Sequence, residues 1–142
     1  MSGNSKTSGL NNELSQLIQI YREEILPQKT RAVHLLGRKC EPRIMYTFLG
    51  FELKLGRKRI NCPDISTARY LRIFAEIGMD SIRIPYDPTR TARLLPDLET
   101  PFFRIKEFLL QQDYPKAEHQ QALRRVYKRI REGLRRKNRK PL

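Results

Sequence analysis

Apolar residues recur at helical spacing in several separate stretches of the chain. A first helix, ended by Pro27, is predicted from an apolar face made of Leu10, Leu14, Leu17, Ile18, Tyr21 and Ile25. A second follows Asp64 or Ser66, either of which can cap it, and ends at Gly78. Its predicted buried face consists of Ala68, Leu71, Phe74, Ala75 and Ile77. A third helix is expected to start at Thr100 and Pro101 and to bury Phe102, Ile105 and Leu109.

Between the first two helices the period changes to that of strands. Phe51, Leu53 and Leu55 alternate with polar residues, and the alternation resumes at Ile60 and Cys62 after a predicted turn over 56–58. Gly50 is interpreted as a bulge or as the boundary between two strands. A short strand is also predicted over 81–85. The stretch 30–42 is ambiguous, and one interpretation is a short helix closed by Gly37.

This order of elements is typical of a small single-domain α+β protein, in which a β-hairpin or short antiparallel sheet is packed by helices. We expect a disordered N-terminal arm over 1–9 and a core domain over 10–114. Residues 115–142 are expected to add a basic amphipathic helix and a flexible tail.

The charge of the chain and its uneven distribution bear on the class of partner. The chain has 142 residues, with 29 Lys and Arg against 15 Asp and Glu, and so a net charge of +14. Between Lys116 and Lys140 there are 11 basic residues and only two acidic ones. Such an excess bears on the choice of partner rather than on the fold, and polyanions, anionic membranes and acidic proteins are the candidates.

The C-terminal stretch carries an apolar stripe and rows of cations. The stripe is formed by Leu123, Val126, Tyr127, Ile130 and Leu134. Beside it lie Arg124, Lys128, Arg131 and Arg135, then Arg125, Arg129 and Arg136, and beyond the last apolar position Lys137, Arg139 and Lys140. Like charges four residues apart repel in a helix, and an anionic partner would relieve that cost. A solvated outer face is the plain alternative, although such faces usually mix both signs of charge.

Arginine predominates among these cations, and its guanidinium fork suits phosphate oxygens. An anionic membrane is disfavoured because Tyr127 is the only aromatic residue of the apolar stripe. Two further basic sites are candidates. Arg57, Lys58 and Arg59 crowd the predicted hairpin turn, and Arg69 lies near a helix start that could hold a phosphate. A charged, solvated turn and simple helix capping explain the same residues.

Signals of catalysis are weak. Glu52, Lys54 and Asp64 are of the types found in metal-dependent nucleases, but their order along the chain is reversed and hairpin alternation already explains the first two. His34, Cys40, Cys62 and His119 lack the close spacing of a metal site, and no phosphate-binding glycine loop is present. A helix-turn-helix is rejected because Pro85 would interrupt its second helix. Two cysteines and no recognisable leader favour a cytoplasmic protein with reduced thiols.

The sequence therefore predicts a protein without cofactor, metal or enzymatic activity that docks on an RNA or DNA backbone through its basic C-terminal helix. RNA is slightly preferred, since backbone and shape recognition need no base-reading helix. The alternative is a small adaptor or assembly factor whose basic helix binds an acidic protein surface.

Overall fold

The fold is known from a computed structural model that describes residues 2–37 and 41–136. Its helices are α1 (Ser2–Ile20), α2 (Ile65–Ile77), α3 (Pro88–Gln111) and α4 (Lys116–Arg135), and a π-helical turn, η1 (Tyr21–Ile25), continues α1. The strands are β1 (Thr30–His34), β2 (Arg43–Thr47), β3 (Gly50–Leu55), β4 (Lys58–Cys62) and β5 (Ser81–Pro85). This confirms a small α+β domain with antiparallel sheets.

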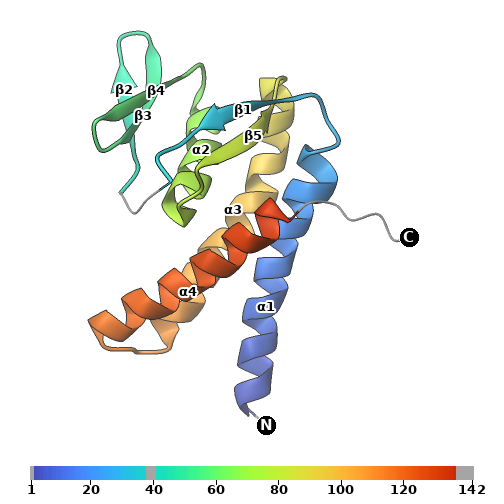
Figure 1. Ribbon diagram of the computed structural model, residues 1–142, viewed down its shortest axis with the longest axis vertical. Helices are drawn as coiled ribbons and strands as arrows, with labels where there is room; N and C mark the ends of the chain where they lie inside the picture. Colours follow the sequence, from blue (N-terminus) through green and yellow to red (C-terminus); the bar gives the residue numbers. More distant parts are fainter. Residues whose placement is uncertain (1, 38–40, 137–142) are drawn as a thin grey trace.

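The strands form two small sheets. β2, β3 and β4 make an antiparallel meander, joined by a turn at 48–49 and by the expected turn at 56–57. Gly50 is thus the boundary between two strands. β1 pairs with β5, with Thr30 opposite Pro85 and His34 opposite Ser81. In Figure 1 the meander lies at one end of the molecule, and α4 crosses over α1 and α3 at the other.

Both sheets and all the helices share one hydrophobic core. Leu17 of α1, Leu53 of β3, Phe74 of α2, Ile105 of α3 and Ile130 of α4 are each completely buried. α2 lies at its centre, because it packs against the meander on one side and against α3 on another. The basic C-terminal helix is therefore part of the same packed body.

The caps and the buried face of α2 are those that the sequence predicted. Asp64 is the N-cap, and its carboxylate accepts a hydrogen bond of 2.7 Å from the backbone N–H of Thr67. Gly78 ends the helix with a φ of +94°, in the left-handed region that glycine adopts without strain. Ala68, Leu71, Phe74, Ala75 and Ile77 are all buried, as predicted. Residues 81–85 follow as a strand, which agrees with rejecting a helix-turn-helix.

One interpretation and one expectation from the sequence were wrong. Residues 30–34 form the strand β1 rather than a short helix, because they pair with β5, far away in the sequence. α1 begins at Ser2, so the arm expected over 1–9 is instead helical from residue 2. That start carries no apolar stripe, and periodicity alone could not place it.

The third helix starts thirteen residues earlier than expected. α3 begins at Pro88, with Asp87 as N-cap, and it continues through Pro96 and Pro101. Thr100 is therefore inside the helix and caps nothing. Buried residues recur along the whole of α3 at intervals of four and three positions, namely Thr91, Leu95, Leu98, Phe102, Ile105 and Leu109. Burial of this continuous stripe outweighs the cost of the two prolines.

Candidate nucleic-acid interface

The amphipathic character of α4 is as the sequence predicted. Val126, Tyr127, Ile130 and Leu134 are buried, and Leu123 is half-buried against the core. Gly133 allows α4 to approach α1 closely, because a Cβ atom at this position would collide with the side chain of Ile18. The apolar stripe thus faces the body of the protein, and the neighbouring cations are left at the surface.

A groove of about 1260 Å³ runs along α4. Its other walls are the C-terminal end of α2, Lys106 of α3, and Gly37, Glu41 and Pro42, which lead into β2. Two carboxylates, Glu41 and Glu76, and six cations line it among the described residues. The cations are Lys106, Arg124, Arg125, Lys128, Arg131 and Arg135. The groove is therefore positively charged, and it is large enough for a polymer segment rather than a small ion.

One of the two carboxylates is already satisfied inside the protein. Glu76 accepts a hydrogen bond of 2.6 Å from the hydroxyl of Tyr127 and lies 3.0 Å from the ammonium of Lys106. Burial, followed by the adjacent charge of Glu76, raises the pKa of Tyr127 well above its ordinary value, so the phenol stays a donor. This cluster attaches α4 to α2 and α3. Within it, the carboxylate of Glu76 compensates the charge of Lys106.

Two of the arginines in the groove also have structural partners. Arg131 donates a hydrogen bond of 2.7 Å to the carbonyl of Ile77, at the C-terminal end of α2 where a cation is favoured. Arg135 lies 3.3 Å from the carboxylate of Asp80. Outside the groove, Arg129 donates a hydrogen bond to Asn11. These three arginines help to attach α4.

The remaining three cations of the groove have no such role. Arg124, Arg125 and Lys128 are exposed, and none makes a hydrogen bond or ion pair with any residue that the structure describes. They lie within about one turn of α4, where Arg124 and Lys128 are four residues apart and repel each other. Their charge is uncompensated within residues 2–37 and 41–136.

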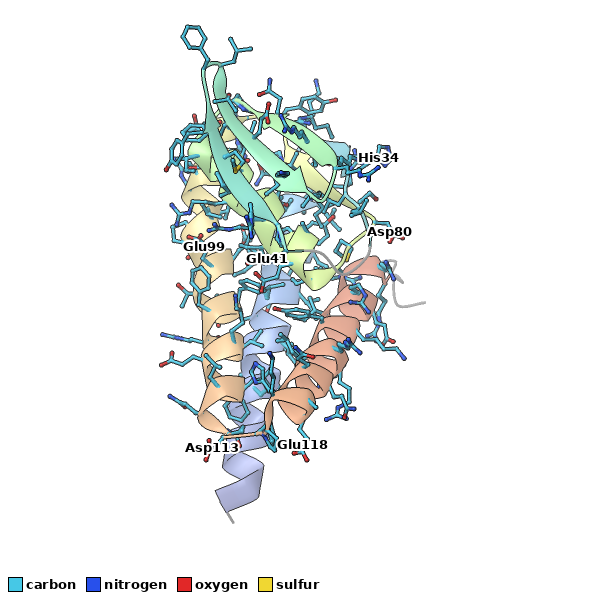
Figure 2. All side chains as sticks on the ribbon, turned by 90° about the vertical axis from the view of Figure 1, so that its left-hand side faces the viewer. His34, Glu41, Asp80, Glu99, Asp113 and Glu118 are labelled. Atoms are coloured by element: carbon cyan, nitrogen blue, oxygen red, sulfur yellow. The ribbon has the colours of Figure 1, made fainter. Side chains whose placement is uncertain are left out.

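The structure connects the basic hairpin turn to the end of this groove. Lys58 donates a hydrogen bond of 2.8 Å to the carbonyl of His34, and the next residue, Leu35, bonds to the carbonyl of Asp80. Asp80 is the partner of Arg135 in α4. In Figure 2 His34 and Asp80 lie between the meander and the C-terminal end of α4. A series of contacts thus links two predicted basic sites that are far apart in the sequence.

Within that turn the three cations differ. Arg57 is exposed at the turn itself, and Lys58 is held by His34. Arg59 lies 3.9 Å from Glu52, and this ion pair is weak because it is long and the arginine is exposed. Arg57 is thus the most available of the three for an external partner.

The third predicted basic site, at Arg69, has a structural explanation. Arg69 forms a bidentate pair with Glu99 of α3, whose side chain is only 9% exposed. The guanidinium compensates a buried carboxylate, and it joins α2 to α3. Sequence reasoning missed this pair because Glu99 gives no local sign of burial. Arg136 is exposed at the end of α4, while Lys137, Arg139 and Lys140 lie outside the described residues.

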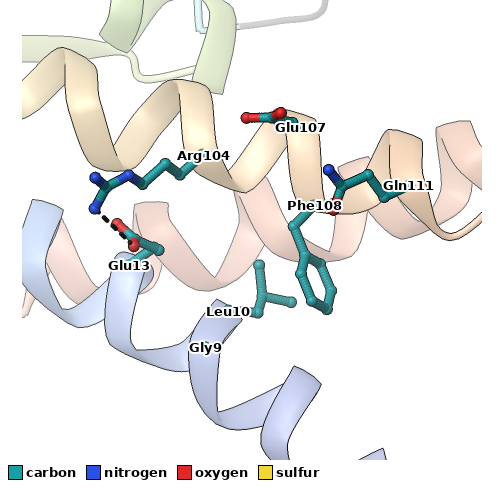
Figure 3. Close-up of a pocket in the computed structure, with 7 residues that line it drawn as sticks. All are labelled: Gly9, Leu10, Glu13, Arg104, Glu107, Phe108 and Gln111. Atoms are coloured by element: carbon teal, nitrogen blue, oxygen red, sulfur yellow. Dashed lines mark hydrogen bonds and ion pairs between the residues drawn. The ribbon is translucent and has the colours of Figure 1, made fainter.

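A smaller cavity of about 260 Å³ lies between α1 and α3 (Figure 3), where Arg104 approaches Glu13 to 3.5 Å beside Leu10 and Phe108. No group of three His, Cys, Asp or Glu among the described residues could hold a metal ion. Cys62 is a buried free thiol whose pKa is raised by that burial, and Cys40 lies outside the described residues. Within 2–37 and 41–136, no helix is long and apolar enough to cross a membrane.

Comparison of the chain with protein-family models, with curated protein sequences and with solved structures found no significant match.

Proposed function

We propose that this protein binds RNA through its phosphate backbone, along the groove beside α4, and that it does so without catalysing a reaction. One observation carries the proposal. Arg124, Arg125 and Lys128 project from a well-packed helix into a large groove, yet they have no partner among the described residues. A folded protein gains no stability from such a cluster of like charges, whereas a polyanion would relieve the repulsion.

The chemistry of the groove favours phosphate. Two of the three cations are arginines, which meet phosphate oxygens with two parallel hydrogen bonds. Phosphate contacts position a nucleic acid without reading its sequence. RNA is preferred to DNA because α4 lies with its apolar stripe in the core, and the described part of the chain offers no free helix to read the bases of a DNA major groove.

The proposal can be tested with a variant in which Arg124, Arg125 and Lys128 are all changed to Gln. Affinity for structured RNA should fall, and the slope of log K against log salt should become shallower by about 2–3, since three phosphate contacts are lost. The loss should be similar for unrelated RNA sequences. The thermal midpoint should be unchanged or slightly higher, because the three side chains stabilise nothing in the fold.

A control variant changes Lys29, Arg90 and Arg93 to Gln. These residues are exposed and lie outside the groove, so the same net charge is removed elsewhere. If both variants lose affinity equally, only net charge matters and the groove is not the site. If the parent protein binds no RNA but captures an acidic protein through the same three residues, the adaptor function replaces the one proposed.

A further inference from the structure

The turn between β2 and β3 exposes large apolar side chains. Phe48 is 103% exposed, Leu49 85% and Tyr46 79%. In Figure 2 this hairpin rises beyond the rest of the molecule. Single exposed apolar residues are ordinary, but three within four consecutive positions at a projecting tip indicate a surface for interaction.

The backbone of the turn does not require these residues. Hairpin turns usually carry Gly, Asn or Asp, which tolerate a positive φ. Here Gly50 takes the positive φ, of +131°, and among described non-glycine residues only Asp113 has one. Phe48 and Leu49 could therefore be polar without strain. Their apolar character serves neither the turn nor the core.

The charges on the same sheet indicate what that partner is. In the register of the meander, Arg43 lies opposite Lys54, and Lys54 lies opposite Arg59. These three cations form a row across one face of the sheet, although like charges directly opposite each other destabilise strand pairing. Glu41 and Glu52 approach Arg43 and Arg59 only to 3.9 Å, and both arginines are exposed, so the two glutamates neutralise the row weakly. A polyanion complements this row.

The hairpin is also continuous with the basic groove. Pro42 lines the groove and immediately precedes β2, and the six residues from there to Phe48 span about 20 Å. A nucleic-acid strand that leaves the groove would pass over the cationic row before it reaches the aromatic tip. The ring of Tyr46, 5.2 Å from that of Phe51, lies on the opposite face of the meander from this row and is not part of the path.

We infer that the β2–β3 tip stacks on unpaired bases of the same RNA whose backbone occupies the groove. This inference rests on the proposed function. Aromatic side chains accept any base on their faces, so the tip would distinguish unpaired from paired RNA without selecting a sequence. The protein would then prefer structured RNA that has a single-stranded overhang or loop beside its duplex.

The chain contains no tryptophan, and Phe48→Trp therefore introduces a single fluorescent probe at the tip. The probe RNAs are a blunt duplex and the same duplex with a single-stranded overhang. Tryptophan fluorescence should be quenched on binding the overhang RNA, because the indole stacks on a base. Quenching should be much weaker with the blunt duplex at equal occupancy. Vesicles of phosphatidylcholine and phosphatidylserine test the membrane as an alternative partner.

Affinities provide an independent measurement. Phe48→Ala should weaken binding of the overhang RNA by about 5- to 150-fold, the range found when a base loses one aromatic partner, and leave the blunt duplex unaffected. Phe103→Ala is the matched control, since Phe103 is an exposed phenylalanine on α3 outside the groove. It should change neither affinity.

The outcomes separate the two proposals. If Phe48→Ala binds both RNAs as the parent does, while the Arg124, Arg125 and Lys128 variant loses both, the tip is not a base-stacking site and the proposed function stands. A shift of the emission of the Phe48→Trp variant to shorter wavelength with vesicles, without quenching by RNA, identifies a membrane surface and overturns the inference. Absence of RNA binding by the parent overturns both.

Discussion

Replacing Phe74 by Ala tests how α2 is packed. Phe74 is completely buried at the centre of the core, with the rings of Tyr21 and Tyr70 at centroid distances of 5.7 and 5.0 Å. Truncating a buried phenylalanine costs about 3–5 kcal/mol of unfolding free energy, through lost burial and the cavity left behind. Two ring contacts, each worth about 0.5–1.5 kcal/mol in addition to burial, place the expected loss in the upper part of that range.

Urea unfolding gives the measurement. With a denaturant slope of about 2 kcal/mol per molar for a protein of this size, the midpoint should fall by roughly 2 M. Phe48→Ala is the control, because the same atoms are removed from a fully exposed side chain. Its free energy of unfolding should differ from that of the parent by no more than about 0.5 kcal/mol. Equal midpoints for Phe74→Ala and the parent would refute this packing of α2 against η1.

Two further predictions concern polar groups. Arg69→Ala should cost about 2–3 kcal/mol in urea unfolding, since it leaves the Glu99 carboxylate buried without a partner; the cost is reduced because the Arg69 side chain is 41% exposed. Adding Glu99→Leu should restore part of the loss. Burial raises the pKa of Tyr21, Tyr70 and Tyr127 above 10.0, so the unfolded chain releases these protons first. Stability should thus be unaffected by these tyrosines below about pH 9 and fall as the pH rises past 10, with their tyrosinate absorbance appearing only on unfolding.

Local sequence patterns predicted those elements whose boundary signals lie within the element itself. The capped helix α2, the β3–β4 turn and the amphipathic α4 each carry their boundary signals within a few residues. β1 could not be recognised in this way, because its partner β5 follows four intervening elements. In α3, Thr100 followed by Pro101 gave a strong local signal for a helix start. The buried stripe that overrides it begins at Thr91 and becomes decisive only once the core is assembled.

The sequence predicted that basic residues of the C-terminal helix form the candidate site, but it did not predict which of them are free to bind a partner. The sequence placed Arg124, Lys128, Arg131 and Arg135 in one row with one expected role. The structure separates them, because the last two attach α4 to Ile77 and Asp80. It instead groups the first two with Arg125 in the groove. Partners contributed by distant elements decide which cations remain available, and a periodic pattern contains no information about them.

The pairing of β1 with β5 has a consequence for the order in which the chain folds. Its paired residues are 47 to 55 positions apart, whereas those of β3 and β4 are separated by only 3 to 11. Closing the longer loop costs more chain entropy, and contacts of high sequence separation slow folding. The meander and α2 lie entirely inside that loop. We therefore expect them to form first, as a nucleus onto which β1 and β5 close, so that substitutions in the β1–β5 pair accelerate unfolding more than they slow folding.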